Sequence, residues 1–268
     1  MRLKIHHSTR YRYDAPATDV IQALRLSPSN HDGQHIIAWR IDADIDGSFR
    51  ESIDAFGNAV TMFYADGPTS DVTITVTGEA EITDTAGIVR APETLPPAVY
   101  LRQTTLTAPD PAIGALAKRF ADREPLAALH ALCGALFNEM RFEVGATTAR
   151  TSAAEALIAG HGVCQDFAHI FVSAARTLGV PARYVSGHLA RTTPQGAAHA
   201  WAEALVPGLG WVAFDPANGI CATTSYLRVA IGLDYRDAAP LRGARRGGGG
   251  EMLSVTVDAS DAMRQSQN

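Results

Sequence analysis

A single cysteine lies in a sequence environment that suits a nucleophile. Cys164 follows the run Gly160-His-Gly-Val and opens a segment, 164–178, with the apolar spacing of a helix. A helix N-terminus carries partial positive charge and free N–H groups, which favour thiolate over thiol and can stabilise an oxyanion. Gly162 leaves room for a substrate backbone to approach. The competing interpretation is a buried structural cysteine, since free cysteine is among the most buried residue types.

Two further residues have the types that would activate such a nucleophile. His199 begins the alternating segment His-Ala-Trp-Ala-Glu, and Asp215 ends the next predicted strand, just before Pro216. A histidine can act as general base or as the cationic partner of a thiolate, and a carboxylate fixes its orientation. Each also has an ordinary explanation, because the chain has nine histidines and an aspartate before a proline is common in turns.

The register of the two strands decides whether these side chains meet. The turn Pro207-Gly-Leu-Gly210 separates the strands, so the histidine and the aspartate lie at the same end of a predicted hairpin. The simplest register pairs Val206 with Trp211, which puts Asp215 on the face away from His199. We therefore predict either a β-bulge, which is frequent beside active sites, or a different register.

Four more positions are candidates for substrate contact or for support of the site: Gln165, His169, Trp201 and Gly162. The Gln165 side chain is a candidate donor to an oxyanion. His169 lies about 140° around the helix from Cys164, so it should face elsewhere and form hydrogen bonds behind the site. Trp201 shares a strand face with His199 and is better explained as core than as a platform for substrate.

The elements that must position these residues fall into two regions. Residues 1–85 favour an antiparallel β-rich domain, with the clearest alternation of apolar and polar residues over 72–77. Residues 86–111 are rich in Pro, Thr and Ala and are interpreted as a connecting segment. Residues 112–268 begin with helices and continue with antiparallel strands, including a last one at 252–257. We interpret them as a catalytic domain and the fold class as α+β.

The composition argues against several classes of function. Charged residues make up 19% of the 268, below the usual value of about 25%, and the formal net charge is −5. Because no run of Lys and Arg is interleaved with aromatic residues, we expect no nucleic-acid partner. No uninterrupted apolar stretch reaches the length of a membrane span, so no membrane partner is expected. Cys and His do not follow zinc spacing and no EF-hand loop is present, so we expect no metal and no other cofactor.

The cysteines also indicate a compartment. Cys133, Cys164 and Cys221 are an odd number without regular spacing, which is not typical of a disulfide framework. Reduced thiols fit a cytoplasmic location, and the first residues lack the apolar region of a signal peptide. We therefore expect a cytoplasmic protein. The oligomeric state is left open.

Four motifs occur in order along the second region. They are Gly162-Val-Cys-Gln-Asp-Phe-Ala-His169, Ala182-Arg-Tyr-Val-Ser-Gly187, His199-Ala-Trp-Ala-Glu203 and Trp211-Val-Ala-Phe-Asp-Pro216. Together they resemble the transglutaminase-like superfamily of papain-like cysteine enzymes, in its bacterial branch. Upstream, residues 7–13 and 54–58 are similar to the N-terminal β region of that branch. The resemblance implies a papain-like, transglutaminase-like catalytic domain.

The resemblance also implies roles and a reaction. Cys164 would be the nucleophile, His199 the base and Asp215 the orienting carboxylate, and a peptide or protein amide would be the substrate. Water as the acyl acceptor gives hydrolysis, whereas an amine gives cross-linking or transfer. We expect an amide hydrolase of the cysteine-protease type, because water is abundant and no amine pocket is legible in the sequence. A protein-glutamine transglutaminase and a non-catalytic binding module that keeps the fold are the alternatives.

Overall fold

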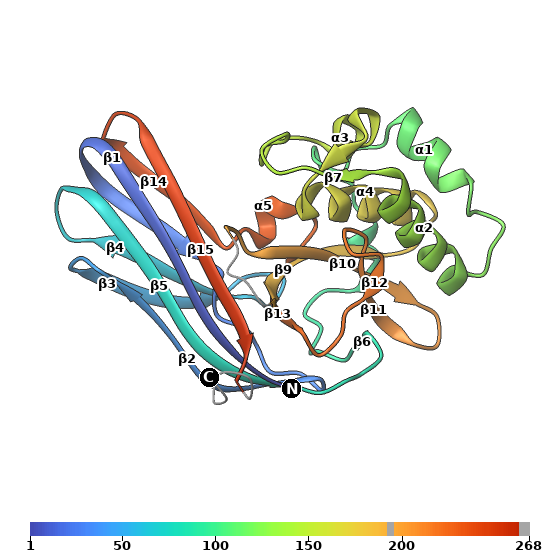
Figure 1. Cartoon of the computed structure of the whole chain (residues 1–268), viewed down its shortest axis with the longest axis horizontal. Helices are drawn as coiled ribbons and strands as arrows, with labels where there is room; N and C mark the ends of the chain where they lie inside the picture. Colours follow the sequence, from blue (N-terminus) through green and yellow to red (C-terminus); the bar gives the residue numbers. More distant parts are fainter. Residues whose placement is uncertain (192–195, 263–268) are drawn as a thin grey trace.

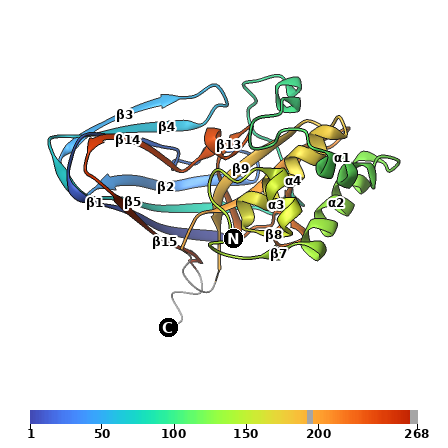
Figure 2. The same ribbon diagram turned by 90° about the horizontal axis from the view of Figure 1, so that it is seen from above.

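The computed structural model describes residues 1–191 and 196–262, and it contains two large antiparallel sheets, a short parallel strand pair and a group of helices. Figure 1 shows the first sheet on the left, the helices α1 to α4 at the upper right and the strands of the second sheet below these helices. Figure 2 shows the same arrangement from above. This architecture confirms the predicted α+β class, with a β region first and a mixed region after it.

The first sheet is built around its first strand. Its order is β2-β5-β1-β4-β3, with β14 and β15 also paired to β1. The first half of β1 lies between β5 and β15, and its second half lies between β4 and β14. The strands are β1 (Arg2–Leu24), β2 (Gln34–Ala43), β3 (Gly47–Ile53), β4 (Ala59–Ala65), β5 (Thr69–Ile82), β14 (Leu241–Gly247) and β15 (Glu251–Asp261).

The last two strands belong to this first sheet, which corrects the expected domain limits. We expected residues 112–268 to form a single catalytic domain, but 241–247 and 251–261 pair with β1. The physical reason is that β1 needs hydrogen-bonding partners along both of its edges. Alternation of apolar and polar residues predicts that a segment is a strand, but it does not name the strand with which that segment pairs.

The second sheet has six strands and carries the predicted histidine and aspartate. Its order is β12-β11-β10-β9-β13, with β6 paired to β11, and every pairing in it is antiparallel. The strands are β6 (Ile88–Val89), β9 (Ala182–Leu189), β10 (His199–Val206), β11 (Gly210–Asp215), β12 (Ile220–Cys221) and β13 (Tyr226–Gly232).

Helix α4 is the central helix of the molecule. It packs on β9 and β10 and is surrounded by α1, α2 and α3. Phe171 of α4 stacks on Phe214 of β11 within the apolar core between helices and sheet. The helical elements of the described chain are η1 (Pro97–Leu101), α1 (Pro111–Lys118), α2 (Pro125–Glu139), α3 (Ala153–Ala159), α4 (Cys164–Thr177) and α5 (Tyr235–Ala238), and the parallel pair is β7 (Arg141–Phe142) with β8 (His161–Gly162). Among the helices described, none is long and apolar enough to cross a membrane.

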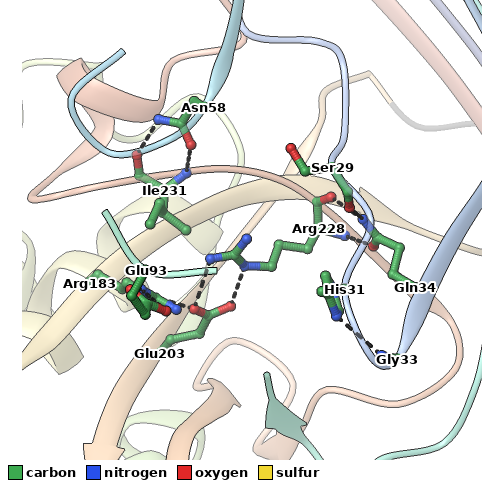
Figure 3. A network of polar contacts seen from close by, with 10 residues as sticks. All are labelled: Ser29, His31, Gly33, Gln34, Asn58, Glu93, Arg183, Glu203, Arg228 and Ile231. Atoms are coloured by element: carbon green, nitrogen blue, oxygen red, sulfur yellow. Dashed lines mark hydrogen bonds and ion pairs between the residues drawn. The ribbon is translucent and has the colours of Figure 1, made fainter. Parts of the chain in front are cut away.

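A buried network of charges joins neighbouring strands of the second sheet, as Figure 3 shows. The Glu203 carboxylate of β10 is fully buried between Arg183 of β9 and Arg228 of β13, at N–O distances of 2.6 and 2.8 Å. Glu93, from the segment 86–111, also pairs with Arg183, at 2.8 Å. Burial opposes the ionisation of Glu203, but Arg228 and Arg183 outweigh it and lower the pKa of this carboxyl to about 2.

Two amide side chains fasten the first region to the second sheet. Gln34 accepts a hydrogen bond from the Arg228 N–H at 2.8 Å and donates one to the Arg228 carbonyl at 2.9 Å. Asn58 forms the same pair of bonds with the backbone of Ile231, both at 2.8 Å (Figure 3). Each amide therefore satisfies backbone groups of β13, which fixes how the two regions sit against one another.

Candidate active site

The start of helix α4 is held in place by a carboxylate behind it. Asp166 accepts hydrogen bonds from the Val163 N–H at 2.8 Å and from the Thr147 hydroxyl at 2.7 Å. A Cβ atom at Gly162 would lie 2.6 Å from an Asp166 carboxylate oxygen. Gly162 therefore makes room for Asp166, whereas we had expected it to make room for a substrate backbone. Through these contacts the helix begins at Cys164.

Cys164 is the cysteine that is placed for chemistry. It is the first residue of α4, where its backbone N–H has no acceptor within the helix and the helix dipole favours negative charge. Its side chain is half-buried and lines a cavity. By contrast, burial raises the pKa of Cys133 to about 12 and also raises the pKa of Cys221.

The hairpin of β10 and β11 brings His199 and Asp215 to one face. Val206 lies opposite Gly210 and Ala202 lies opposite Phe214, which is one residue away from the simplest register. Continuing the pairing by one residue places Asp215 across from Trp201, and Trp201 shares its face with His199. The different register that we offered as one of two solutions is confirmed, and the recorded pairs run without a bulge.

Asp215 is a buried acceptor surrounded by donors. His199 Nε2 lies 2.6 Å from its Oδ2 atom, and the same oxygen accepts from the Tyr226 hydroxyl at 2.7 Å and from Asn218 Nδ2 at 2.6 Å. The backbone N–H of Ala217 donates to the other oxygen, Oδ1, at 3.0 Å. Burial opposes ionisation, but the hydrogen bonds from His199, Asn218 and Tyr226 lower the pKa of Asp215. The side chain is therefore a carboxylate at neutral pH.

His199 lies between this carboxylate and the thiol. Burial lowers its pKa, but hydrogen bonds with Asp215 and Cys164 and the attraction of both groups raise the pKa to about 9. Because Nε2 faces Asp215, Nδ1 is the nitrogen left for the thiol. The ring is thus an imidazolium at neutral pH. Such an arrangement is chemically suited to nucleophilic attack followed by proton transfer.

The remaining predicted residues take different places around these three side chains. Gln165 is half-buried and lines the same cavity as Cys164. His169 is fully buried on another side of α4, where its Nε2 atom accepts the Tyr235 N–H at 3.0 Å and its ring lies against Tyr184. Trp201 is buried and stacks on His199 with ring centroids 6.1 Å apart. These two rings are buried, while Gln165 lines the cavity.

Two neighbours of Asp215 were not found from the sequence. Asn218 follows the aspartate by three residues in Asp-Pro-Ala-Asn, and this turn pattern was a local signal that could have indicated it. Tyr226 lies on the separate strand β13, eleven residues further along. Its contact depends on the pairing of β13 with β9, which no local pattern predicts.

The cavity beside Cys164 has a volume of about 410 Å³. Cys164, Gln165 and His199 lie on one side of it, and side chains of the first sheet lie on the other. Among residues 1–191 and 196–262, no three His, Cys, Asp or Glu side chains are grouped so as to hold a metal ion.

This fold and this site define a papain-like class of cysteine enzyme, and comparison with known proteins gives the family. Residues 114–216 match the transglutaminase-like superfamily, and residues 3–81 match the bacterial transglutaminase-like N-terminal region. The protein belongs to the transglutaminase-like superfamily, in the bacterial branch that the sequence motifs resemble.

Relatives and a solved structure cover almost the whole chain. The uncharacterized protein ML0607 of Mycobacterium leprae is 32% identical over 280 residues, covering 96% of this chain and 98% of the relative. The uncharacterized protein Rv2569c of Mycobacterium tuberculosis is 31% identical over 272 residues, covering 90% and 87%. A crystal structure from Cytophaga hutchinsonii, provisionally described as a cysteine protease, superposes with a TM-score of 0.80 at 21% identity and covers 98% of this chain and 91% of its own. At that identity the likeness shows the fold.

Proposed function

We propose that the protein is a cysteine-dependent amide hydrolase acting on a peptide or protein substrate. Cys164 is the nucleophile, His199 the acid and base, and Asp215 the group that orients and charges the imidazole. The observation that carries the proposal is the placement of His199 between the thiol and a buried carboxylate, with the imidazole pKa raised to about 9. A structural cysteine has no need of such a partner.

The reaction proceeds in two steps. The thiolate attacks the amide carbonyl carbon, and the backbone N–H of Cys164 at the start of α4 donates to the oxyanion. The C–N bond breaks as the His199 imidazolium gives its proton to the leaving amine, which leaves a thioester. Neutral His199 then takes a proton from water, which attacks the thioester. The acid product leaves, and the thiolate and imidazolium are restored.

Hydrolysis is proposed over transfer to an amine because of the charge of the cavity. No Asp, Glu, Lys or Arg is found among the described residues that line it. A lysine acceptor would therefore have to enter as a cation with no carboxylate beside it, which is unfavourable. Water needs no such site. The cytoplasmic location expected from the unpaired cysteines stays a prediction.

Product analysis in isotopically labelled water tests this proposal. The protein is incubated with a mixed peptide library in H₂¹⁸O, with and without a lysine derivative, and the products are identified by mass spectrometry. We expect new carboxyl termini that carry ¹⁸O, and no products from the Cys164→Ala variant. Amine adducts without hydrolysis would replace the proposal by a transglutaminase. Equal cleavage by Cys164→Ala would overturn the role of Cys164, and a lack of any product with unreactive Cys164 would indicate a binding module.

A further inference from the structure

The cavity beside Cys164 is shared by the two sheet regions. One wall comes from the second region and includes Cys164 and Tyr184. The opposite wall comes from the first sheet, where Tyr11 of β1 and Leu253 and Val255 of β15 line the same space. Figure 1 shows that the strands β1 and β15 lie on the side of the first sheet nearest to α5. The first sheet therefore forms part of the surface that a substrate at Cys164 would touch.

The strand register explains why one sheet face supplies this wall. Tyr11 pairs with Leu253, and Thr9 pairs with Val255, so the four side chains lie together on neighbouring strands. Successive residues of a strand face opposite sides, which sends Ser254 and Thr256 to the other face. The correction to the domain limits matters here, because β15 is the C-terminal strand that completes the first sheet.

The wall is mostly apolar, with His7 and Thr9 as polar members, and its described residues include no Asp, Glu, Lys or Arg. Leu253 is 52% exposed and lines the cavity, so it presents apolar surface to it. Among the described residues of this wall, the ionisable side chains are His7 and Tyr11. Burial raises the pKa of Tyr11, whereas His7 is buried, is bonded to Thr9 at 2.9 Å and has its pKa lowered by burial to about 4. Both side chains are therefore neutral at physiological pH. A charged substrate group would lose its water here and find no partner.

We propose that this cavity binds an uncharged, apolar side chain of the substrate next to the scissile amide, and that β1 and β15 determine this preference. The inference rests on the proposed function, because it concerns the substrate of the same nucleophile. A volume of about 410 Å³ is in the range of ligand pockets, which are roughly 300–1,000 Å³, and exceeds the needs of a single small side chain. A large aliphatic or aromatic side chain is therefore the expected occupant.

Alkylating probes test the preference without the need for turnover. The rate of labelling of Cys164 is measured with N-benzyl iodoacetamide and with its para-carboxylate, each divided by the rate with plain iodoacetamide. In every case the sulfur–carbon bond forms as iodide leaves, so the ratios report fit to the cavity. For the wild-type protein we expect the benzyl ratio to exceed the carboxybenzyl ratio by about 10-fold. This corresponds to about 1.4 kcal/mol, slightly less than full burial of an apolar side chain contributes.

Substitutions on the two faces of β15 locate the effect. Val255→Glu should lower the benzyl ratio by about 10-fold, and Leu253→Ala, a milder change, should lower it by about 3-fold. Thr256→Glu, exposed on the other face of the same strand, is the matched control and should leave the ratio as in the wild type. Thermal melts of each variant show whether the fold is kept. If Val255→Glu unfolds, Leu253→Ala remains as the test variant.

The outcomes separate this inference from the proposed function. Equal benzyl and carboxybenzyl ratios, or ratios that do not respond to Val255→Glu and Leu253→Ala in folded protein, overturn the apolar site and leave the nucleophile intact. Slow labelling by plain iodoacetamide overturns the proposed nucleophile. The ratios would still be measurable in that case, so a benzyl preference that depends on β15 would continue to support the site.

Discussion

The imidazole of His199 takes its properties from two opposed effects. Burial favours the neutral ring, whereas Asp215 and Cys164 favour the charged ring, and the second effect prevails with a pKa of about 9. Asp215 keeps its charge because Tyr226 and Asn218 also donate to it. The pKa of this proposed acid and base is therefore set mainly by the neighbouring side chains.

The variant Asp215→Asn tests this balance. Without the carboxylate, only Cys164 still opposes the effect of burial, so the pKa of His199 should fall below about 9. An NMR titration of the histidine rings measures it, with His199→Ala to assign the signal. A His199 pKa that stays near 9 in Asp215→Asn would show that Asp215 does not hold the charge.

How much of the site the sequence reveals depends on which contacts are local. Cys164, His199 and Asp215 are found because each lies in a motif and the motifs occur in order. The Tyr226 hydroxyl reaches Asp215 only through the pairing of β13 with β9, and no spacing in the sequence encodes that pairing. Local sequence patterns do not predict tertiary contacts of this kind.

At the scale of elements, the turn between β10 and β11 decides the geometry of the site. We expected a four-residue turn, 207–210, but Gly210 already pairs with Val206, which leaves a three-residue loop. Gly208 and Gly210 have positive φ angles of 78° and 90°, which glycine adopts without strain. One residue fewer in the loop reverses the faces of β11, and this moves Asp215 to the side of His199.

The start of helix α4 is the other element on which the site depends. In Gly162→Ala the new Cβ would clash with Asp166, the carboxylate that accepts the Val163 N–H just before Cys164. We expect a loss of about 1–3 kcal/mol in the free energy of unfolding, measured by chemical denaturation. Gly134→Ala in α2 is the matched control, because nothing lies within 4 Å of its Cβ position. That control should stabilise the protein slightly, by about 0.5–1 kcal/mol. Equal stability of Gly162→Ala and the wild type would contradict the account of α4.

For the whole molecule, burial keeps several histidines neutral. Burial lowers the pKa of His7, His31 and His169 to about 4 and that of His188 to about 3. The rings of His7 on β1 and His188 on β9 meet edge to face, 5.5 Å apart, where the two sheet regions touch. Protonation of either ring would place a charge in that contact.

The sign of the acid response follows from these lowered values. Above pH 6.5 the histidines are neutral in both folded and unfolded chains, so their contribution to stability is complete. As the pH falls from 6.5 toward 4, these histidines become protonated in the unfolded chain but stay neutral in the folded chain, so stability is lost. Each histidine should contribute on the order of 1 kcal/mol per pH unit in this range. Urea unfolding at pH 7, 6 and 5 measures the slope of the free energy of unfolding against pH. His188→Leu should reduce this slope by the contribution of one bound proton. A flat stability profile over this range would show that these rings are not held neutral.

The arrangement of the two sheets is the feature that the sequence reveals least. The β-rich start, the helices and the later strands can be predicted from the sequence because their periodicities differ. The pairing of β14 and β15 with β1 cannot be predicted in this way, because strand pairing over more than 200 residues leaves no local pattern. This pairing brings Leu241, Leu253 and Val255 into the lining of the cavity beside Cys164.

The pH dependence of Cys164 alkylation by iodoacetamide tests the central claim most directly. The labelled peptide is identified by mass spectrometry, with Cys164→Ala and His199→Ala as controls, and the raised pKa of Cys133 and Cys221 keeps their background low. With the pKa of His199 at about 9, the imidazolium persists at pH 6. We predict fast labelling that continues below pH 7 and is slowed by His199→Ala. Labelling that rises only near pH 8.5, as for an ordinary thiol of pKa about 8.5, and that does not respond to His199→Ala, would contradict a His-paired thiolate.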